Sequence, residues 1–321
     1  MARIKVAVLR GGPSSEYEVS LQTGNTILAN LGEKYEAVDI FIDRAGVWHH
    51  RGRPVEPSRI LPQVDVVFNA LHGEFGEDGE VQRLLETYGV PYTGSRPLAA
   101  ALSMNKIRSK EIAQSLGIPT PRHISFSYEG DTESQAKDIF FTLFQPLIVK
   151  PVSLGSSVGV FFTQGLPSLI DAMDRLRESG VPFMVEEFRK GKEATVGVID
   201  NFRGTKRYTP FPIEIRPAHK SPVFDYTAKY SGASEELCPG TFSKKQSEEL
   251  QRYARDMHEA LDMRHYSRSD FIVTPKATYY LETNSLPAFT KESLLPKSLS
   301  AVGATIPEFL NHVLDLTLRT A

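Results

Sequence analysis

The chain has 321 residues, with 37 Lys and Arg set against 39 Asp and Glu, and its formal net charge is therefore -2. This balance argues against a nucleic-acid-binding protein, because such proteins carry a basic excess that neutralises phosphates. A hydrophobic content of 40% argues against disorder, and the length predicts two or three folded domains.

Cysteine usage and hydropathy indicate where the protein works. Cys238 is the only cysteine, so no intrachain disulfide can form and a secreted disulfide scaffold is disfavoured. The apolar run at the N-terminus is too short for the core of a signal peptide. No stretch of the sequence approaches the ~20 apolar residues of a membrane span. We therefore expect a cytoplasmic protein without a membrane-spanning segment.

The first ninety-odd residues read as alternating strands and helices. Three strands are predicted there, over residues 5–9, 37–42 and 64–69. Ser15, followed three residues later by Glu18, is a capping-box pattern for the first helix. The apolar face of that helix is expected to consist of Leu21, Leu28 and Leu31. This order is typical of a parallel α/β sheet, in which ligands bind beyond the carboxyl ends of the strands.

A second segment begins near Pro97. Asn105 is the expected N-cap of a helix that ends near Leu116, and Ser168 with Asp171 predicts the start of a later helix. Two strands, over 146–151 and 158–162, are expected around a Gly/Ser loop. The segment is predicted to end at residues 180–182.

The remaining residues form the third segment. Its strands are expected over 183–188, 194–200, 269–273 and 277–282. Ser243 and Gln246 form a capping-box pattern for a helix in this segment. The buried face of that helix is predicted from helical spacing to contain Leu250, Tyr253, Met257 and Leu261.

The last two strands form a hairpin that carries acidic residues. A turn near Lys276 places Asp270 opposite or diagonal to Glu282, with Asn284 on the same face as Glu282. A site that has only a few carboxylates and no His or Cys suits Mg²⁺ that also binds substrate phosphates. An exposed acidic face neutralised by Arg268 explains the spacing equally well, so both interpretations stay open here.

Three glycine-rich loops are candidates for anion or substrate binding. Lys150 stands at a strand end before a Gly/Ser loop whose backbone N–H groups can approach phosphates, although the order is not that of a P-loop. Such a loop also occurs as an ordinary turn. Glu16 and His72 lie in the other glycine-rich stretches. By themselves, a carboxylate at a helix start and a loop histidine are more often structural.

Seven stretches, in order and with similar gaps, resemble the D-alanine–D-alanine ligases of the ATP-grasp superfamily over nearly the whole chain. They are residues 11–20, 70–79, 103–110, 149–159, 225–230, 266–270 and 281–287. The resemblance implies the ATP-grasp α/β fold, with an N-terminal Rossmann-like parallel α/β domain over 1–96, a small α+β ATP-binding subdomain over 97–182 and a larger C-terminal α+β subdomain over 183–321.

The resemblance also implies the reaction and its cofactors. The family joins two D-alanines through an acyl phosphate formed from ATP, for peptidoglycan precursor synthesis. Two Mg²⁺ ions, or Mn²⁺ in their place, would be held at the ATP phosphates by Asp270, Glu282 and Asn284. Its remaining nucleotide-site residues are Lys106, Lys150 and Lys229 at the phosphates, Gly155, Ser156 and Ser157 in the loop, and Glu186 and Glu193 at the adenine and ribose.

At the reacting centre, Arg268 matches the arginine that stabilises the oxyanion of the tetrahedral intermediate. Glu16 matches the group that binds the ammonium of the first D-alanine, and His72 matches a histidine near the substrates. The residues that match the other substrate-site positions are Ser293 and Leu294 at the carboxylate of the second substrate, and Ser156 and Tyr230 in a hydrogen-bond triad with Glu16.

One position departs from the family pattern. Ala288 stands where the family usually has glycine, and a side chain there would be strained by roughly 1 kcal/mol or more if φ had to be positive. Two alternatives therefore stay open: an ATP-binding homologue with impaired ligation, and a ligase with another amino or hydroxy acid acceptor. Tyr230 favours D-alanine over D-lactate as acceptor. The expected partners are D-alanine and ATP, without nucleic acid, and the family resemblance implies a homodimer.

Overall fold

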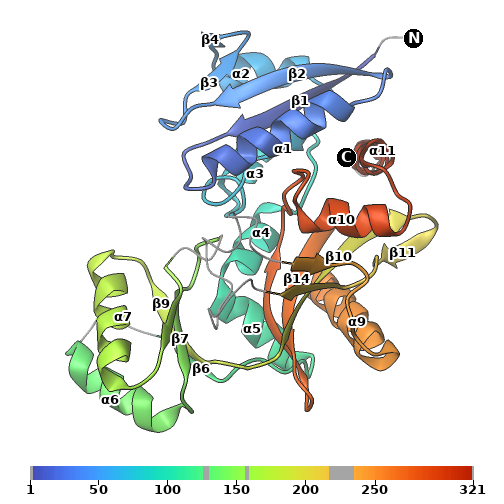
Figure 1. Ribbon diagram of the computed structural model, residues 1–321. Helices are drawn as coiled ribbons and strands as arrows, with labels where there is room; N and C mark the ends of the chain where they lie inside the picture. The colour runs from blue at the N-terminus through green and yellow to red at the C-terminus, as the bar shows by residue number, and fades with distance from the viewer. Residues whose placement is uncertain (1–2, 126–129, 156–158, 217–234, 320–321) are drawn as a thin grey trace.

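The computed structural model describes residues 3–125, 130–155, 159–216 and 235–319 (Figure 1). Three separate sheets organise it, with five, four and six strands. In Figure 1 the five-stranded unit lies at the top and the four-stranded unit at the lower left, beside the six-stranded one. Within these residues, no helix combines the length and apolar character that crossing a membrane requires.

The first sheet has the strand order β4-β3-β2-β1-β5, and β1 pairs in parallel with both β2 and β5. The parallel α/β layer predicted for this segment is thus confirmed, and an antiparallel β3–β4 hairpin extends one edge. Its strands are β1 Ile4–Gly11, β2 Tyr35–Ile42, β3 Trp48–His50, β4 Arg53–Pro54 and β5 Val66–Asn69. Its helices are α1 Tyr17–Asn30, α2 Pro57–Ile60, the 3-10 turn η1 Leu61–Gln63 and α3 Glu80–Thr87.

Helix α1 begins differently from the prediction. Glu16 is its N-cap and makes no side-chain capping bond, so the capping box predicted at Ser15 is wrong. Of the predicted apolar face, Leu28 and Leu31 are partly buried against the core cluster, and the fully buried residues of α1 are Ser20, Thr23, Gly24 and Ile27. Small residues are needed there because a Cβ at Gly24 would lie 2.5 Å from the Cβ of Arg10. This close approach brings the start of α1 to the carboxyl end of β1.

The second sheet is antiparallel, in the order β6-β9-β7-β8. Its elements are β6 His123–Ser125, α6 Thr132–Thr142, β7 Leu147–Pro151, β8 Phe161–Thr163, α7 Leu166–Glu178 and β9 Phe183–Glu187. Helix α7 starts at Leu166 with Gly165 as N-cap, and Ser168 instead bonds back to Gln164, which corrects the predicted start. The division of the chain into domains remains a prediction, and the pairing of β9 with β7 leads us to place the second boundary after Glu187.

The third sheet has the order β13-β12-β10-β14-β15, with β11 paired to β10. Its elements are β10 Lys192–Phe202, β11 Thr205–Tyr208, β12 Ile213–Arg216, β13 Glu235–Leu237, α9 Lys244–Ala260, β14 Tyr266–Val273, β15 Thr278–Asn284 and α10 Leu294–Ala301. The capping box of Ser243 and Gln246 is present, and the predicted face of α9 is buried. Helices α4 Pro97–Met104 and α5 Lys106–Ser115 contact β15, and Ala113 shares the hydrophobic cluster of α9. The side chain of Asn105 caps α5, as predicted.

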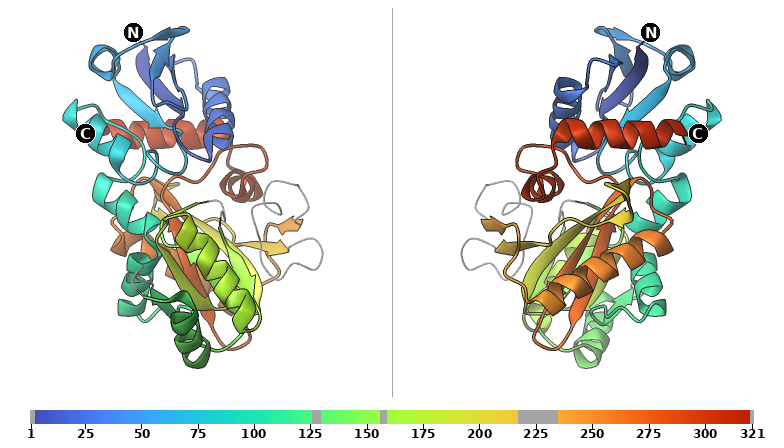
Figure 2. Two further views of the ribbon diagram at one scale, coloured as in Figure 1. Left: turned by 90° about the vertical axis from the view of Figure 1, so that its left-hand side faces the viewer. Right: turned by 90° about the vertical axis from the view of Figure 1, so that its right-hand side faces the viewer.

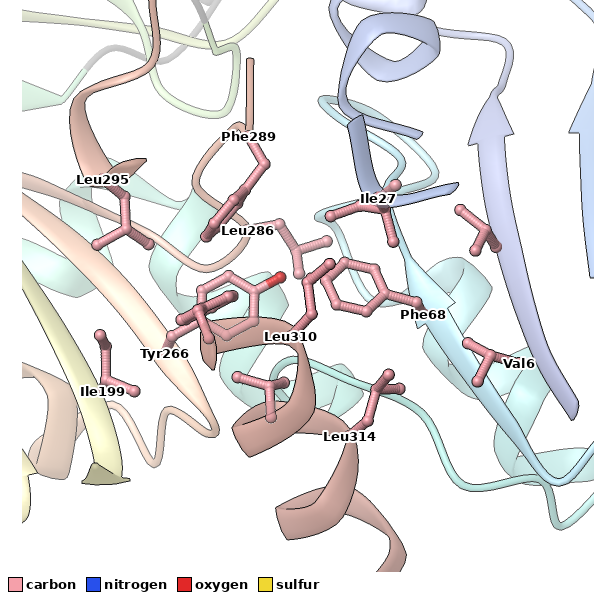
Figure 3. Packing of buried hydrophobic residues seen from close by; sticks show 14 of the residues in the cluster. Val6, Ile27, Phe68, Ile199, Tyr266, Leu286, Phe289, Leu295, Leu310 and Leu314 are labelled. Carbon is pink, nitrogen blue, oxygen red and sulfur yellow. The ribbon is translucent and has the colours of Figure 1, made fainter. Parts of the chain in front are cut away.

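The C-terminal helix α11, Ile306–Arg319, returns to the first sheet (Figure 2). It contacts α1 and β5, and one buried cluster continues from the first sheet through α11 to the third sheet. Figure 3 shows Ile27 and Phe68 on one side of Leu310, with Tyr266 and Phe289 on the other. Full burial of one such side chain contributes about 1.5–3 kcal/mol. The cluster therefore holds the N-terminal unit firmly against the loop that follows β15.

Candidate active site

A cleft of about 780 Å³ lies where the N-terminal unit, the Gly/Ser loop and the third sheet meet. It brings together predicted site residues that are far apart in the sequence: Glu16, His72, Gly155, Glu193, Arg268, Asp270, Glu282, Asn284, Ser293 and Leu294. Lys106 joins this group through an ion pair with Glu282. Ser156, Ser157, Lys229 and Tyr230 lie outside the described residues.

The acidic hairpin has the predicted register. Asp270 is paired directly with Glu282, and Arg268 with Asn284. Because Asp270 is only 7% exposed, its carboxylate needs partners. It receives hydrogen bonds from Thr195 Oγ1 at 2.5 Å, from Asn284 Nδ2 at 3.2 Å and from Arg268 at 3.2 Å.

The charge of Arg268 is maintained by this neighbourhood. Burial alone lowers the pKa of the guanidinium, but the Asp270 carboxylate raises it, and the net direction is upward. The second carboxylate of the hairpin, Glu282, lies 3.2 Å from Lys106 Nζ. The hairpin therefore presents an arginine and two carboxylates side by side on the wall of the cleft.

The donor set of the hairpin suits a hard cation that is partly ligated by a substrate. Among the described residues, no three or more His, Cys, Asp or Glu side chains cluster closely enough to form a metal site by themselves. Asp270, Glu282 and Asn284 offer two carboxylates and one amide oxygen. Mg²⁺ typically uses one or two carboxylates and takes its other ligands from water and phosphate oxygens. The residues present thus fit Mg²⁺ that arrives with a nucleotide.

A second charged cluster lies behind the Gly/Ser loop. Glu186 is buried and forms ion pairs with Lys150 Nζ at 2.5 Å and with Lys110 Nζ at 2.9 Å. Burial raises the pKa of Glu186, but the two ammonium groups outweigh it and hold the pKa well below its usual range. Burial lowers the pKa of Lys110 despite the carboxylate beside it. Lys106 Nζ donates to the carbonyl of Leu154 at 2.7 Å, so three lysines converge near the loop.

Lys110 was not predicted as a site residue. It stands in the matching stretch 103–110, but a lysine on a helix is usually solvated and nothing in its spacing indicates burial. In the structure its side chain is fully buried. Only the packing of α5 against the third sheet and the Gly/Ser loop reveals its contact with Glu186.

The Gly/Ser loop touches the N-cap of α1 at Gly155. A Cβ built on Gly155 would lie 2.3 Å from Glu16 Oε1, so only glycine fits against this carboxylate as it stands. The backbone N–H of Glu16 donates to Ser14 Oγ, and Ser14 in turn donates to the carbonyl of His72. Glu16 is therefore held where the two glycine-rich loops of the first sheet meet the loop of the second.

His72 is 3% exposed and uses both ring nitrogens within the protein. Its Nε2 lies 2.9 Å from Thr23 Oγ1, and its Nδ1 lies 3.2 Å from Glu77 Oε1. Glu77 also lines the cleft and was not predicted as a site residue, because an acidic residue in a glycine-rich loop carries no distinctive pattern.

The loop after β15 connects the hairpin to α10. Ser293 is the N-cap of α10 and Leu294 its first residue, and Ser293 Oγ accepts a hydrogen bond from the Thr290 N–H at 2.9 Å. Among the described residues, left-handed φ values at non-glycine positions do not include Ala288. The strain considered for Ala288 therefore does not arise. Backbone strain at Ala288 was the reason for considering a homologue with impaired ligation, and this reason no longer holds.

Comparison with known proteins agrees with this geometry. The family model described as D-ala D-ala ligase C-terminus matches residues 112–315, and the one described as D-ala D-ala ligase N-terminus matches residues 5–60 and 51–95. A D-alanine--D-alanine ligase of Carboxydothermus hydrogenoformans is 35% identical over 98% of this chain and 99% of its own length.

Solved structures extend the similarity to the fold. The D-alanine--D-alanine ligase of Bacillus anthracis complexed with ATP is 31% identical with a TM-score of 0.81, covering 99% of this chain and 98% of that one. The VanG D-Ala:D-Ser ligase of Enterococcus faecalis is 29% identical with a TM-score of 0.85, covering 98% of this chain and 100% of that one. The chain belongs to the D-alanine–D-alanine ligase family, and its fold is the ATP-grasp fold.

Proposed function

We propose that this protein joins two D-alanines to D-alanyl-D-alanine with consumption of ATP, a step that supplies peptidoglycan precursor synthesis. Family membership over nearly the full chain supports the activity, and the ATP-bound relative supports the nucleotide. The observation that carries the proposal is the cleft itself. Its lining includes Glu16 of the N-terminal unit, Arg268 and Asp270 of the hairpin, and Ser293.

In the first step, the γ-phosphoryl group of ATP moves to the carboxylate of the first D-alanine, giving an acyl phosphate and ADP. Glu16 would bind the ammonium group of this D-alanine, and Lys106 and Lys150 would offset the negative charge of the phosphates. Glu186 and Glu193 would contact the adenine and ribose. Because phosphoryl transfer requires little covalent chemistry from the protein, positioning of the reactants and charge compensation supply most of the rate acceleration.

In the second step, the amine of the second D-alanine attacks the acyl phosphate carbonyl. The C–O bond to phosphate breaks as the tetrahedral intermediate collapses, and the amine loses a proton. Arg268 and the backbone N–H of Ala288 would stabilise the oxyanion, a kind of contact worth roughly 2.7–4 kcal/mol per donor. Ser293 Oγ and the N–H of Leu294 would receive the carboxylate of the second D-alanine, where the N-terminus of α10 favours an anion.

Mg²⁺, or Mn²⁺ in its place, completes the proposed nucleotide site. Asp270, Glu282 and Asn284 would hold the two ions that the family resemblance implies. When bound, they would neutralise the charge that develops on the transferred phosphoryl group. In the structure Arg268 forms an ion pair with Asp270 and Lys106 forms one with Glu282, so both carboxylates interact with positive charge.

The proposal is tested by incubating the protein with ATP, Mg²⁺ and D-alanine, and then measuring phosphate release and dipeptide. A parallel panel replaces D-alanine as acceptor by D-serine or D-lactate. Dipeptide and phosphate in equal amounts support the proposal, whereas no phosphate release with any D-amino acid refutes it.

We also propose, from the family resemblance, that the protein is a homodimer. Sedimentation at working concentrations tests this oligomeric state.

A further inference from the structure

A line of buried hydrogen bonds runs from the loop at residue 77 to the backbone after Ala288. The N–H of Phe289 donates to Thr23 Oγ1 at 3.2 Å. Thr23 Oγ1 lies 2.9 Å from His72 Nε2, and His72 Nδ1 lies 3.2 Å from Glu77 Oε1. Thr23 is 2% exposed and Phe289 is fully buried, so water does not replace these bonds.

The partners give this line a single direction. A carboxylate accepts hydrogen bonds only, so Glu77 Oε1 selects the imidazole tautomer with its proton on Nδ1. In this tautomer Nε2 carries no proton and accepts, and the single hydroxyl proton of Thr23 points to it. A lone pair of Thr23 Oγ1 is thereby directed at the N–H of Phe289.

The line joins two parts of the reaction site that belong to different units. Glu16, the proposed ammonium ligand, stands at the start of α1, and Thr23 lies two turns further along the same helix. Phe289 directly follows Ala288, whose N–H is the proposed partner of Arg268 at the oxyanion. Ile27 of α1 and Phe289 lie in the same apolar cluster (Figure 3), which is not directional. The Thr23 hydroxyl supplies the directional contact that the cluster lacks.

We propose that Thr23 is a positioning residue for the ligation reaction. Its hydroxyl, oriented by His72 and Glu77, holds the 287–289 backbone so that the N–H of Ala288 faces the oxyanion and stays in register with Glu16. The inference rests on the proposed function for the reaction that it serves. The hydrogen bond to Phe289 can be tested without that reaction.

The first experiment compares Thr23→Val, which keeps the shape and removes the hydroxyl, with Thr23→Ser, which keeps the hydroxyl. Leaving the buried N–H of Phe289 without its acceptor costs free energy, and we expect kcat to fall by roughly 10- to 100-fold in Thr23→Val. KM for ATP should stay within about 3-fold, because the nucleotide contacts are elsewhere. Thr23→Ser should recover kcat to within about 3-fold.

A control and a second readout separate positioning from folding. Thr87→Val is the matched control, because the Thr87 hydroxyl donates to the Arg83 carbonyl one turn earlier, on the exposed surface of α3. Rates are normalised to the number of ATP-binding sites, which removes any unfolded fraction. Amide exchange at Phe289 should be faster by about 10-fold in Thr23→Val and unchanged in Thr87→Val and Thr23→Ser.

The outcomes are distinct. Unchanged kcat in Thr23→Val, or equal losses in Thr23→Val and Thr23→Ser, overturns the positioning role. Unchanged exchange at Phe289 in Thr23→Val overturns the hydrogen bond on which the role depends. If the wild-type protein forms no dipeptide, the proposed function fails, and the exchange measurement still decides the contact.

Discussion

Gly155 is the residue at which a single methyl group tests the placement of Glu16. The Cβ of Gly155→Ala would lie 2.3 Å from Glu16 Oε1, whereas ordinary contact begins at 3.4 Å. The carboxylate must therefore move by about 1 Å, and a shift of that size in a reacting constellation costs up to ~100-fold in rate. The φ of Gly155 is not left-handed, so alanine imposes no backbone strain of its own.

We expect Gly155→Ala to lower kcat/KM for the first D-alanine by roughly 10- to 100-fold, since the charge-assisted bond to its ammonium is weakened. KM for ATP should change by less than about 3-fold, because the carboxylate is displaced rather than the lysines. The assay is steady-state phosphate release with D-alanine and ATP varied in turn.

The matched control for this experiment is Gly32→Ala. Among the described residues its added Cβ would meet Asn311 Oδ1 at 3.8 Å, Gly32 does not line the cleft, and its φ is likewise not left-handed. It should behave as the wild-type protein does. If Gly155→Ala also keeps kcat/KM for D-alanine within about 2-fold, the assignment of Glu16 to the first substrate is wrong.

Three further substitutions test other parts of the site. Glu282→Ala should reduce phosphate release by roughly 100-fold or more while leaving the circular dichroism spectrum unchanged, because one proposed Mg²⁺ ligand is lost; normal turnover at ordinary Mg²⁺ contradicts that ligand. Lys110→Met should lower the free energy of unfolding by ~3 kcal/mol in neutral urea titrations, because Glu186 keeps only one lysine. The lowered pKa of Glu186 gives stability that is present above its ordinary pKa and is lost as pH falls. The difference in free energy of unfolding between the wild-type protein and Lys110→Met should therefore become smaller in acid, and a difference that stays constant with pH would argue against this cause. Ala288→Gly should change kcat by less than about 3-fold, because alanine is unstrained there, and a large gain would show the opposite.

Local signals in the sequence predicted several features of the fold correctly. Asn105 and Ser243 cap their helices because a side-chain oxygen near the first free N–H groups is a local interaction. The pairing of Asp270 with Glu282 follows from the short turn between their strands, which sets the register of the hairpin. The register of this hairpin was therefore predictable from spacing, whereas the role of its residues in a metal site came from the family resemblance and remains a prediction.

Packing between distant segments was not predictable in this way. The close approach of Gly24 in α1 to Arg10 in β1 joins two elements through packing, and the membership of β9 in the second sheet depends on its pairing with β7. Lys110 of α5 is buried beside Glu186 of β9, which also pairs with Lys150 of β7. These contacts depend on tertiary structure, which overrides local propensity.

In the proposed reaction an acyl phosphate links ATP to the new peptide bond, and oxygen labelling detects this intermediate most directly. The protein is given ATP, Mg²⁺ and D-alanine whose carboxylate carries ¹⁸O, and the products are analysed by mass spectrometry. Our account predicts one ¹⁸O transferred to phosphate for each D-alanyl-D-alanine formed. Dipeptide accompanied by unlabelled phosphate, or phosphate released without dipeptide, would contradict it.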